Sequence, residues 1–428
     1  MRIFFIFMFC LSAIAGFSQE KLSPKELFEE GQYFFEREDY KEAAYFYTKL
    51  VEKIPDNANY NFKAGECYLK IPGQEHLAVS FFEKAAKKVI AKNDYKENDF
   101  SEYNAPLHAL FYLGNAYRIS GKLDDALKTY EKFIDSPYFY HSYNINFVEQ
   151  EINSCERAKI IQDVPIDLIK TKVNNKINTN YSEFNPVVSA DENTLIFNRG
   201  LKFYDAIFMS KKIDGDWATP VNINEEVVSD GDFYPTALNS NGTILLLTRE
   251  ENQNADIYIS YYRNNKWTKA EKIPGKINTY VQETYATFGT DDNTIYLVSD
   301  RQGSVGGKDI FVSKLDSKGN WGKPKNIGSI VNTSEDEETP VICNSGNTLF
   351  FSSKSHYNMG GFDIFYSYFE NNKWSTPRNV GYSLSTTRDD LFYIVNKGCM
   401  TGFYSIIDTE TGFADIYEIE TKTFLAVP

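Results

Sequence analysis

Histidine and tryptophan are scarce in this 428-residue chain, which contains four of each. No two histidines form the His-Glu-x-x-His pair of a helical zinc site, so a histidine-rich metal centre is not expected. Basic residues are also too few, because 45 Lys and Arg oppose 59 Asp and Glu, for a formal net charge of −14. Nucleic-acid binders need a basic surface. We therefore expect no bound metal, no cofactor and no nucleic-acid partner.

The sequence has no apolar run of the roughly 20 residues that a transmembrane helix needs. A shorter apolar run at residues 3–14 follows Arg2 and precedes the small residues Gly16 and Ser18. This is the pattern of a secretory signal peptide. We assign residues 1–18 to that signal and predict an exported, periplasmic protein that is not an integral membrane protein.

Cysteine is sparse as well, with four residues after the predicted cleavage site and no Cys-x-x-Cys pair. Export leads to an oxidising compartment, where four cysteines allow three sets of disulfide pairings that the sequence does not distinguish. We favour the alternative that they are buried, unpaired and act as small hydrophobic side chains. The four residues are Cys67, Cys155, Cys343 and Cys399.

Residues 19–162 repeat with a helical pattern. Gly31 and Gly65 are 34 residues apart, which is the period of tetratricopeptide repeats, and Gly114 marks a third unit. A small residue lets the two helices of a unit approach each other, and aromatic residues fill the space between them. The sequence therefore predicts three tetratricopeptide-like helix pairs.

Three further signals describe the limits of this helical domain. Ser23-Pro24-Lys25-Glu26 is a capping box with proline at the first helical position, so the first helix should begin there. A polar insertion near residues 92–104 separates the second and third units and predicts a loop. A last helix near residues 146–162 is expected to cap the array, as terminal repeats must.

Residues 163–428 repeat with a different period. The four tryptophans are spaced by 50, 54 and 53 residues, and an aspartate that opens a strand precedes each of them by 11 or 12 residues. Turn signals followed by β-rich runs recur upstream of each aspartate. Several short strands in units of about 50 residues predict the blades of a β-propeller. The tryptophans are Trp217, Trp267, Trp321 and Trp374.

The ring of blades needs a strand from the start of the domain to close it. A fifth tryptophan strand would fall near residue 427, where the chain ends, and the apolar strand Val164–Thr171 has no neighbouring partner. We predict that this strand supplies the outer strand of the last blade, which removes exposed sheet edges. The expected propeller then has five blades.

Two of the units contain Gly-Gly-x-Asp-Ile-Phe, at residues 306–311 and 360–365, and residues 347–353 read Asn-Thr-Leu-Phe-Phe-Ser-Ser. These motifs resemble the WD40-like repeats of TolB-type propellers. The order of signal peptide, tetratricopeptide repeats and propeller is similar to bacterial envelope proteins that usually continue into an OmpA-like peptidoglycan-binding domain. Some members of that family serve type IX secretion. The sequence stops at Pro428 without an OmpA-like domain, so direct peptidoglycan binding is not expected.

The resemblance implies a multidomain fold, an all-α tetratricopeptide solenoid followed by an all-β propeller. It also implies a non-enzymatic scaffold of the periplasm or cell envelope that binds envelope proteins or peptides. Outer-membrane or type IX secretion assembly is the expected setting, with attachment to the outer membrane through partners.

Enzyme motifs are absent, since the sequence has no G-x-S-x-G elbow, P-loop or G-x-G-x-x-G. We therefore expect no catalytic residues. The alternative is a carbohydrate-active or glycan-binding propeller, because the turn Ser189–Thr194 is like those of sialidase-type propellers. A glycosidase needs two carboxylates at a fixed separation, and the same turn is also ordinary hairpin chemistry.

One predicted binding surface is a ring of acids at one mouth of the propeller channel. An acid recurs three residues before the proline, or its equivalent, of the innermost strand of each blade, and equivalent positions of a radial fold form a ring. Such a ring would hold a cation or a basic peptide. The alternative is that each acid accepts hydrogen bonds from the loop backbone of its own blade. The five acids are Glu183, Asp232, Glu283, Glu337 and Asp389.

The other predicted surface is the concave groove formed by the first helix of each repeat. An aromatic residue recurs at the fifth position of these helices, which favours an apolar peptide or helix as the ligand. The alternative is that these aromatics pack within the array. The predicted groove residues are Phe28, Gln32, Phe62, Glu66, Phe111, Asn115 and Arg118.

Overall fold

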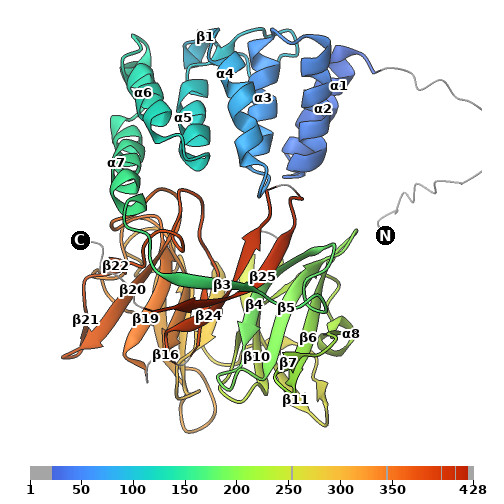
Figure 1. Cartoon of the computed structure of the whole chain (residues 1–428), viewed down its shortest axis with the longest axis vertical. Helices are drawn as coiled ribbons and strands as arrows, with labels where there is room; N and C mark the ends of the chain where they lie inside the picture. Colours follow the sequence, from blue (N-terminus) through green and yellow to red (C-terminus); the bar gives the residue numbers. More distant parts are fainter. Residues whose placement is uncertain (1–21, 252–253, 344–345, 397, 410, 423–428) are drawn as a thin grey trace, which may run out of the picture.

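The chain folds into a helical domain that stands on a ring of β-sheets (Figure 1). We describe this arrangement from a computed structural model. The predicted signal peptide lies outside the described residues. These are residues 22–251, 254–343, 346–396, 398–409 and 411–422.

Three helix pairs and a final helix form the helical domain within the described residues. The pairs are α1 (Pro24–Phe35) with α2 (Tyr40–Lys53), α3 (Ala58–Leu69) with α4 (Ala78–Ala85), and α5 (Ala109–Ile119) with α6 (Leu123–Ile134). The final helix is α7 (Ile145–Gln162). Short turns and a two-strand ladder connect them, namely η1 (Glu75–Leu77), η2 (Lys92–Asp94), η3 (Phe139–His141), β1 (Val89–Ile90) and β2 (Ala105–Pro106).

The local signals of the sequence explain these helices. Helix α1 begins at the predicted capping box, where Ser23 N donates to Glu26 Oε2 at 2.7 Å and Glu26 N donates to Ser23 Oγ at 3.3 Å. A Cβ added to the glycine of each pair would lie 2.9, 2.8 or 2.3 Å from an aromatic ring of the second helix. Only glycine therefore permits the observed approach. The three contacts are Gly31 to Tyr47, Gly65 to Phe82 and Gly114 to Tyr130.

The described strands that follow form five antiparallel sheets, so the predicted five-bladed propeller is confirmed. Blade 1 contains β4 (Ser182–Val188), β5 (Thr194–Gly200), β6 (Asp205–Ile213), β7 (Asp216–Trp217) and β8 (Val221–Asn222). Blade 2 contains α8 (Asn224–Val227), β9 (Phe233–Leu238), β10 (Ile244–Glu251), β11 (Asn254–Arg263), β12 (Lys266–Trp267) and β13 (Glu271–Lys272). Blade 3 contains β14 (Glu283–Phe288), β15 (Thr294–Ser299), β16 (Asp309–Lys314) and β17 (Lys325–Asn326).

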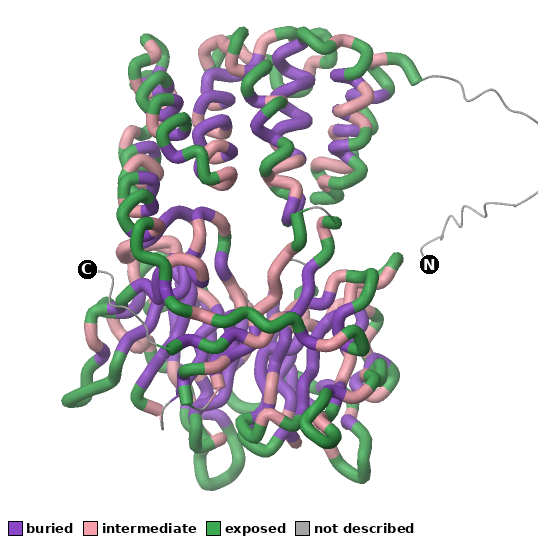
Figure 2. The backbone as a smooth tube through the Cα atoms, in the orientation of Figure 1, coloured by how far each residue is buried: buried purple, intermediate pink, exposed green. Residues whose placement is uncertain are grey.

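The last two blades complete the ring. Blade 4 contains β18 (Glu337–Cys343), β19 (Thr348–Ser353), β20 (Asp363–Glu370), β21 (Lys373–Trp374) and β22 (Arg378–Asn379). Blade 5 contains β23 (Ile394–Val395), β24 (Thr401–Ile407), β25 (Ala414–Thr421) and, from the start of the domain, β3 (Leu168–Lys172). Strand β3 pairs antiparallel with β25, so the predicted closure is confirmed. Figure 2 shows that β3 is exposed along most of its length, as expected for an outer strand.

The core of the propeller lies between neighbouring blades. Apolar residues of β5 and β6 pack on those of β10, and the same arrangement repeats around the ring. Blade 5 meets blade 1 through the ring pair Trp217 and Phe403, whose centroids are 6.2 Å apart. The recurring tryptophan is therefore a buried packing residue between blades.

A disulfide joins two neighbouring blades, which corrects the expectation that all four cysteines are unpaired. Cys343 at the end of β18 is bonded to Cys399, just before β24, with Cα atoms 5.7 Å apart. Cys67 and Cys155 are buried and unpaired, as expected. The disulfide therefore connects blade 4 to the inner strands of blade 5.

The helical domain is fixed to blades 4 and 5. Arg157 Nη1 donates to His356 O at 3.0 Å, and Ser154 Oγ bonds Asn358 Oδ1 at 2.8 Å. Met359 is fully buried in the apolar core that α5, α6 and α7 form. Figure 1 shows the β24–β25 hairpin rising towards the turn after α3, where Ile407 approaches Gly73.

Candidate binding sites

The concave groove of the helical array is occupied by the chain's own insertion. Residues 92–104 form the predicted loop, but it packs on α1 and α3. Tyr95 donates to Asn59 Oδ1 at 2.6 Å, and Tyr60 donates to Phe100 O at 2.7 Å. Lys63 binds Glu97 at 3.2 Å. The insertion is therefore an ordered part of the helical domain.

The predicted groove residues consequently have other roles, and an open aromatic stripe is not what the structure shows. Phe28 and Phe62 are buried, the latter against Phe82, Tyr95 and Tyr112. Phe111 is half-buried against the rings of α6. The physical reason is that aromatic residues at helical spacing fill the space between paired helices.

The four polar residues predicted for the groove are also engaged. Gln32 Nε2 donates to Asn98 Oδ1 of the insertion at 3.1 Å. Glu66 pairs with Lys63 at 3.5 Å, and Asn115 accepts from the Tyr130 hydroxyl at 2.7 Å. A hollow of about 310 Å³ remains beside the insertion, lined in part by Phe28 and Gln32.

Arg118 lies between the two domains instead of in the groove. Its Nε is 2.9 Å from Glu151 Oε2, and its Nη1 donates to Thr387 O at 2.5 Å. The guanidinium packs on Gly360, where any Cβ would overlap it. Arg118 therefore connects α5 and α7 to the loops of blades 4 and 5.

The recurring acids are structural in four blades. A threonine four residues earlier donates to the carboxylate through both its backbone N–H and its hydroxyl. For Glu283 these distances are 2.8 and 2.7 Å, and Glu283 itself is fully buried. The same pair of bonds recurs as Thr179 to Glu183, Thr333 to Glu337 and Thr386 to Asp390.

A second bond pattern precedes each of these threonines. Asn278 accepts from Ile257 N and donates to Ile257 O, both at 2.8 Å, so it binds the third strand of the preceding blade. We call this unit, an Asn or Ser followed by Thr and an acid four residues later, the blade latch. It occurs at residues 178–183, 278–283, 332–337 and 385–390.

The structure corrects the predicted ring at two positions. The register of β9 against β10 pairs Phe233 with Arg249, as β4 pairs Glu183 with Arg199. Phe233 therefore replaces the acid in blade 2, and Asp232 is one residue too early. Asp389 is early by one residue in the same way, because Asp390 makes the latch bonds in blade 5.

An open ring of five carboxylates is therefore absent from the described residues. Glu183, Glu283 and Glu337 are fully buried and bonded within their own blades. A cavity of about 110 Å³ in the propeller is lined by inner-strand residues such as Val187, Phe288 and Ile342. None of the five predicted acids lines it. The alternative of local hydrogen bonding, left open by the sequence, describes these three acids.

Blade 2 is the blade that departs from the latch. Val228 stands where the others have Asn or Ser, and it adopts φ 61°, a rare conformation for a β-branched residue. Asn224 of α8 accepts from Ile207 N at 2.7 Å in its place. Its Nδ2 has no hydrogen-bond partner among the described residues, although Asn224 is only 7% exposed.

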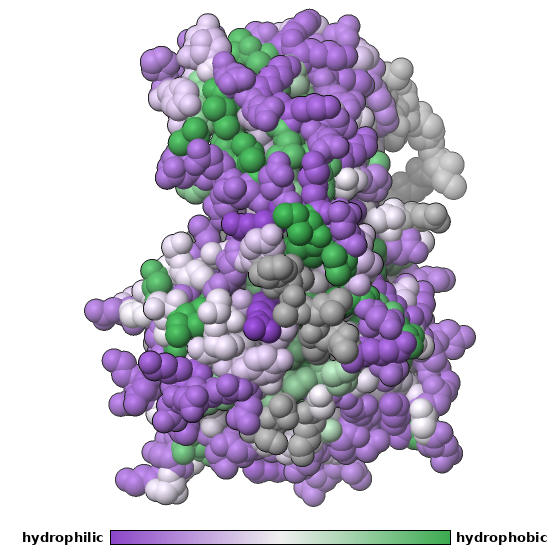
Figure 3. Space-filling model, turned by 60° about the vertical axis from the view of Figure 1, so that its left-hand side comes forward, coloured by the Kyte–Doolittle hydropathy of each residue, from purple (hydrophilic) through white to green (hydrophobic). Residues whose placement is uncertain are grey.

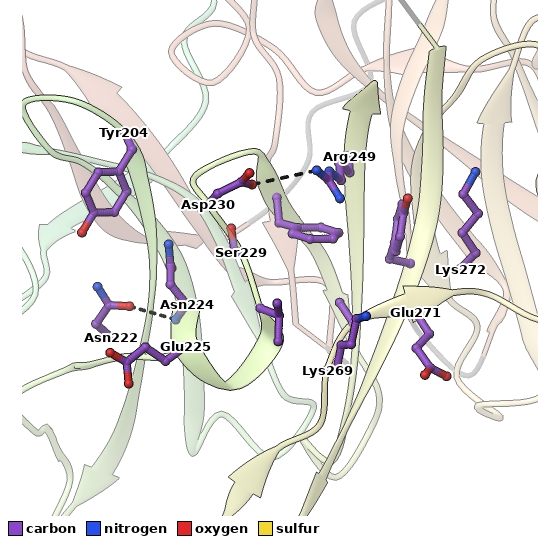
Figure 4. Close-up of a pocket in the computed structure, with 14 residues that line it drawn as sticks. Tyr204, Asn222, Asn224, Glu225, Ser229, Asp230, Arg249, Lys269, Glu271 and Lys272 are labelled. Carbon is purple, nitrogen blue, oxygen red and sulfur yellow. Dashed lines mark hydrogen bonds and ion pairs between the residues drawn. The ribbon is translucent and has the colours of Figure 1, made fainter. Parts of the chain in front are cut away.

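A large hollow lies beside this irregular segment. It has a volume of about 1220 Å³ and extends from β8 of blade 1 and α8 of blade 2 to β11 and β13 of blade 2. Figure 4 shows Tyr204 and Asn224 on one side, Arg249 above the centre, and Lys269 and Lys272 on the other side. We call it the blade 2 pocket.

The floor and the upper rim of the pocket differ in chemistry. Phe233 and Tyr258 are buried and meet edge to face, with centroids 4.9 Å apart. Arg249 lies over the Phe233 ring, 5.2 Å from its centroid. The Arg249 guanidinium binds Asp232 through Nε and Glu251 through Nη2 at 2.9 Å. The pocket thus combines an apolar floor with a charged rim.

Sequence reasoning missed the residues of this pocket. Only Asp232, which pairs with Arg249 at its rim, was among the predicted sites. The signal that would have found the others is the latch motif itself. Aligning residues 228–233 with the other four copies shows that blade 2 has lost both its amide and its buried acid.

Two classes of feature are missing from the part of the chain that the structure describes. No helix in it is long and apolar enough to cross a bilayer. No three His, Cys, Asp or Glu side chains in those residues are grouped so as to hold a metal ion. Hydrophilic residues cover most of the propeller face seen in Figure 3, while apolar residues gather on the helical domain and at the junction of the domains.

Comparison with known proteins agrees with the helical repeat. Residues 108–137, which contain α5 and α6, match the family model described as tetratricopeptide repeat. The comparison with curated proteins gives no match. One helix pair thus matches the tetratricopeptide repeat, the other two pairs repeat its contact between a glycine and an aromatic ring, and the propeller is defined by its own five sheets.

The solved structures that resemble parts of this chain have low identity to it. It is similar to TolB from Acinetobacter baumannii, with 12% identity over 65% of this chain and 70% of that chain and a TM-score of 0.37. A thermostable family-43 glycoside hydrolase is 13% identical over 60% of this chain and 97% of its own, with a TM-score of 0.39. The first TPR domain of the human RPAP3 protein is 21% identical over 32% of this chain and 92% of its own, with a TM-score of 0.24.

Proposed function

We propose that the protein is an exported, non-enzymatic scaffold of the cell envelope that binds a segment of another protein in the blade 2 pocket. The observation that carries this proposal is the broken latch of blade 2 beside a hollow of about 1220 Å³. Four copies of the latch hold blades together. The corresponding segment of blade 2 lacks the latch bonds, and it lies beside the largest hollow described above.

The two repeat domains support a scaffolding role because both provide extended surfaces on which a partner can bind. Side chains of η1, α5 and α7 and the turn after α3 hold the helical array on blades 4 and 5. Large aromatic side chains on loops of the other blades are exposed, among them Phe203 and Tyr280. Exposed aromatic residues are enriched at protein interfaces.

The proposed location rests on the signal pattern and on the disulfide. Disulfides persist in oxidising compartments such as the periplasm and are rare in the cytosol. The pair Cys343 and Cys399 therefore agrees with an exported protein. Assembly of an outer-membrane or type IX secretion complex is the setting we propose for the scaffold.

Site-specific photo-crosslinking in intact cells tests the proposal. A photoreactive residue at Tyr204, on the pocket wall, should yield one discrete adduct that protease digests and a glycan-degrading enzyme leaves intact. Tyr140 provides the control, because it is an exposed aromatic of the helical domain. Equal adducts at both positions, an adduct to glycan, or glycan hydrolysis that depends on Asp230 and Asp232 would contradict the proposal.

A further inference from the structure

At the rim of the blade 2 pocket three carboxylates surround the guanidinium of Arg249, while Lys269 and Lys272 line the other side and Lys272 is paired with Asp256. Arg249 binds Asp232 and Glu251, and its Nη2 is 3.9 Å from Asp230. The side chains of Asp230 and Glu251 are 80% and 47% exposed, so both present oxygens to solvent. Three carboxylates around one cation leave a local excess of two negative charges.

The matching site in blade 1 is balanced and closed. Arg199 Nε lies 2.6 Å from Glu183, a one-to-one pair in which the acid is fully buried. Blade 3 repeats this with Arg301 and Glu283 at 2.9 Å. Blade 2 keeps the arginine but has Phe233 at the buried position, so its acids lie at the surface around the same guanidinium. The three-to-one ratio of acids to arginine distinguishes blade 2 from blades 1 and 3.

The pKa values of Asp230 and Asp232 shift in opposite directions, in part because the two acids lie close together. Burial, followed by the hydrogen bond with Asp230, raises the pKa of Asp232. That hydrogen bond also lowers the pKa of Asp230. Adjacent carboxylates repel each other, and a cation placed beside them relieves that repulsion.

The Asn224 amide indicates that the ligand also carries a hydrogen-bond acceptor. Asn224 Nδ2 is a buried donor without a partner, and its identity as nitrogen is set by the bond that Oδ1 accepts from Ile207 N. Figure 4 shows the Asn224 side chain directed between Tyr204 and Ser229, towards the interior of the pocket. An unsatisfied buried donor requires an acceptor. The carbonyl oxygen of a peptide backbone is such an acceptor.

We propose that the pocket binds an extended protein segment by a lysine or arginine side chain, whose cationic group lies between Asp230 and Glu251. This proposal rests on the proposed function and specifies the chemistry of its partner. The methylene groups of the basic side chain pack on Phe233 and Tyr204, and Asn224 Nδ2 donates to a backbone carbonyl. Arg249 acts as a positioning residue that holds the carboxylates in place.

Capped heptapeptide libraries test this proposal with the full chain. The central residue is lysine, N-acetyl-lysine, arginine or citrulline, and the flanking residues are randomised and uncharged. We expect the lysine and arginine libraries to be retained and their neutral counterparts to be lost. The affinity of the best peptide should fall when salt rises, because exposed charge pairs are screened.

The variant Asp230→Asn/Glu251→Gln removes two exposed charges and leaves the Arg249–Asp232 pair intact. We expect it to weaken the best peptide about tenfold or more, as loss of a charge pair at an interface does. The control is Asp300→Asn, an exposed acid of blade 3 whose bond from Gln282 N an amide oxygen can keep. Circular dichroism and melting should show both variants folded.

Equal retention of charged and neutral libraries, no enrichment in any library, or equal affinity of the double variant and wild type would overturn the proposal. Displacement of the peptide by neutral oligosaccharides at the same site would overturn it in favour of a glycan. The crosslinking experiment distinguishes failure of the proposed scaffold function from failure of cation recognition alone. A protein adduct at Tyr204 that persists in Asp230→Asn/Glu251→Gln retains the proposed function and rejects cation recognition.

Discussion

Blade 4 and blade 2 are copies of one unit, but their loops serve different purposes. Blade 4 keeps its latch, is joined to blade 5 by a disulfide, and extends residues 354–362 against α5 and α7. Blade 2 has lost both ends of the latch and borders an open pocket. The contacts that restrain blade 4 are replaced in blade 2 by exposed charge and an unpartnered amide.

The difference teaches that burial, more than residue type, decides what a repeated side chain does. Glu283 and Asp232 are both acids that pair with an arginine, and both lie at the start of an inner strand. Glu283 Oε1 accepts from the side chains of Thr279, Ser299 and Arg301, and Oε2 accepts from Thr279 N, so both oxygens have a partner. Asp232 is 29% exposed and shares its arginine with two other acids. Repetition thus identifies structural residues, and deviation from it identifies the candidate site.

The largest expected effect comes from removing an acid of the closed kind. Glu283→Ala leaves the guanidinium of Arg301 buried without its ion-pair partner, which costs about 3–5 kcal/mol of unfolding free energy. Asp232→Ala leaves Arg249 with Glu251 and solvent, and should cost below about 1 kcal/mol. Urea unfolding of the two variants measures the difference. Similar losses in both would refute the distinction between closed and open acids.

A somewhat smaller effect is expected from the disulfide that stabilises the blade 4 side. It joins residues 56 positions apart, and opening such a loop costs about 2–4 kcal/mol. Reductant should therefore lower the unfolding free energy of the wild type. Cys343→Ser/Cys399→Ser should begin at the lower value and not respond to reductant. A wild type that is equally stable with and without reductant would contradict the role assigned to the disulfide.

The fold was more predictable than the site, for a physical reason. Glycine spacing, tryptophan spacing and the unpaired strand before blade 1 follow from packing that every repeat must satisfy, so the sequence displays it several times. The groove prediction failed because Phe62 has the same helical spacing in a core as in an open groove. The pocket was missed because Phe233 and Asn224 differ from the repeat, and a search for recurring residues passes over them.

The exact positions of the recurring acids show the same limit of prediction from sequence, here by a single residue. Asp232 and Asp389 lie next to the equivalent positions, and adjacent acids such as Asp389 and Asp390 cannot be told apart by spacing alone. The hydrogen bond from Thr386 N to Asp390 at 2.6 Å decides between them. That choice depends on which side chain points inward, and a loop sequence does not determine that direction.

The pH dependence of stability sharpens the contrast between latches with and without an arginine. Glu337 has Ser353 where blade 1 has an arginine, and burial raises the pKa of Glu337 to about 7. Between pH about 4.5 and 7 the unfolded chain has released this proton while the folded chain retains it, so stability falls as pH rises through that window. The fall is at most a few kcal/mol.

Denaturant unfolding at several pH values measures this slope. Burial also raises the pKa of Asp390 to about 7 and the pKa of Asp363 well above its usual value, so Glu337→Gln should remove only part of the slope. Stability that rises with pH across the window, or a slope that Glu337→Gln does not change, would refute the assignment.

The smallest effect on global stability, and the sharpest on domain arrangement, is expected from Gly360→Ala. Gly360 has φ 113°, and a Cβ there would lie 2.3 Å from Arg118 Nη1. The loop that holds Asn358 and His356 against α7 must then move away, which releases the helical domain from blade 4.

Gly303→Ala is the matched control, because Gly303 has φ 102° in the blade 3 loop and no atom lies within 4 Å of the added Cβ. Both variants carry the same backbone strain of about 1–3 kcal/mol, but only the first disturbs the interface. Small-angle scattering and proteolysis near residue 164 should therefore change for Gly360→Ala alone. If the two variants behave alike, the docking of the helical domain does not depend on the blade 4 loop.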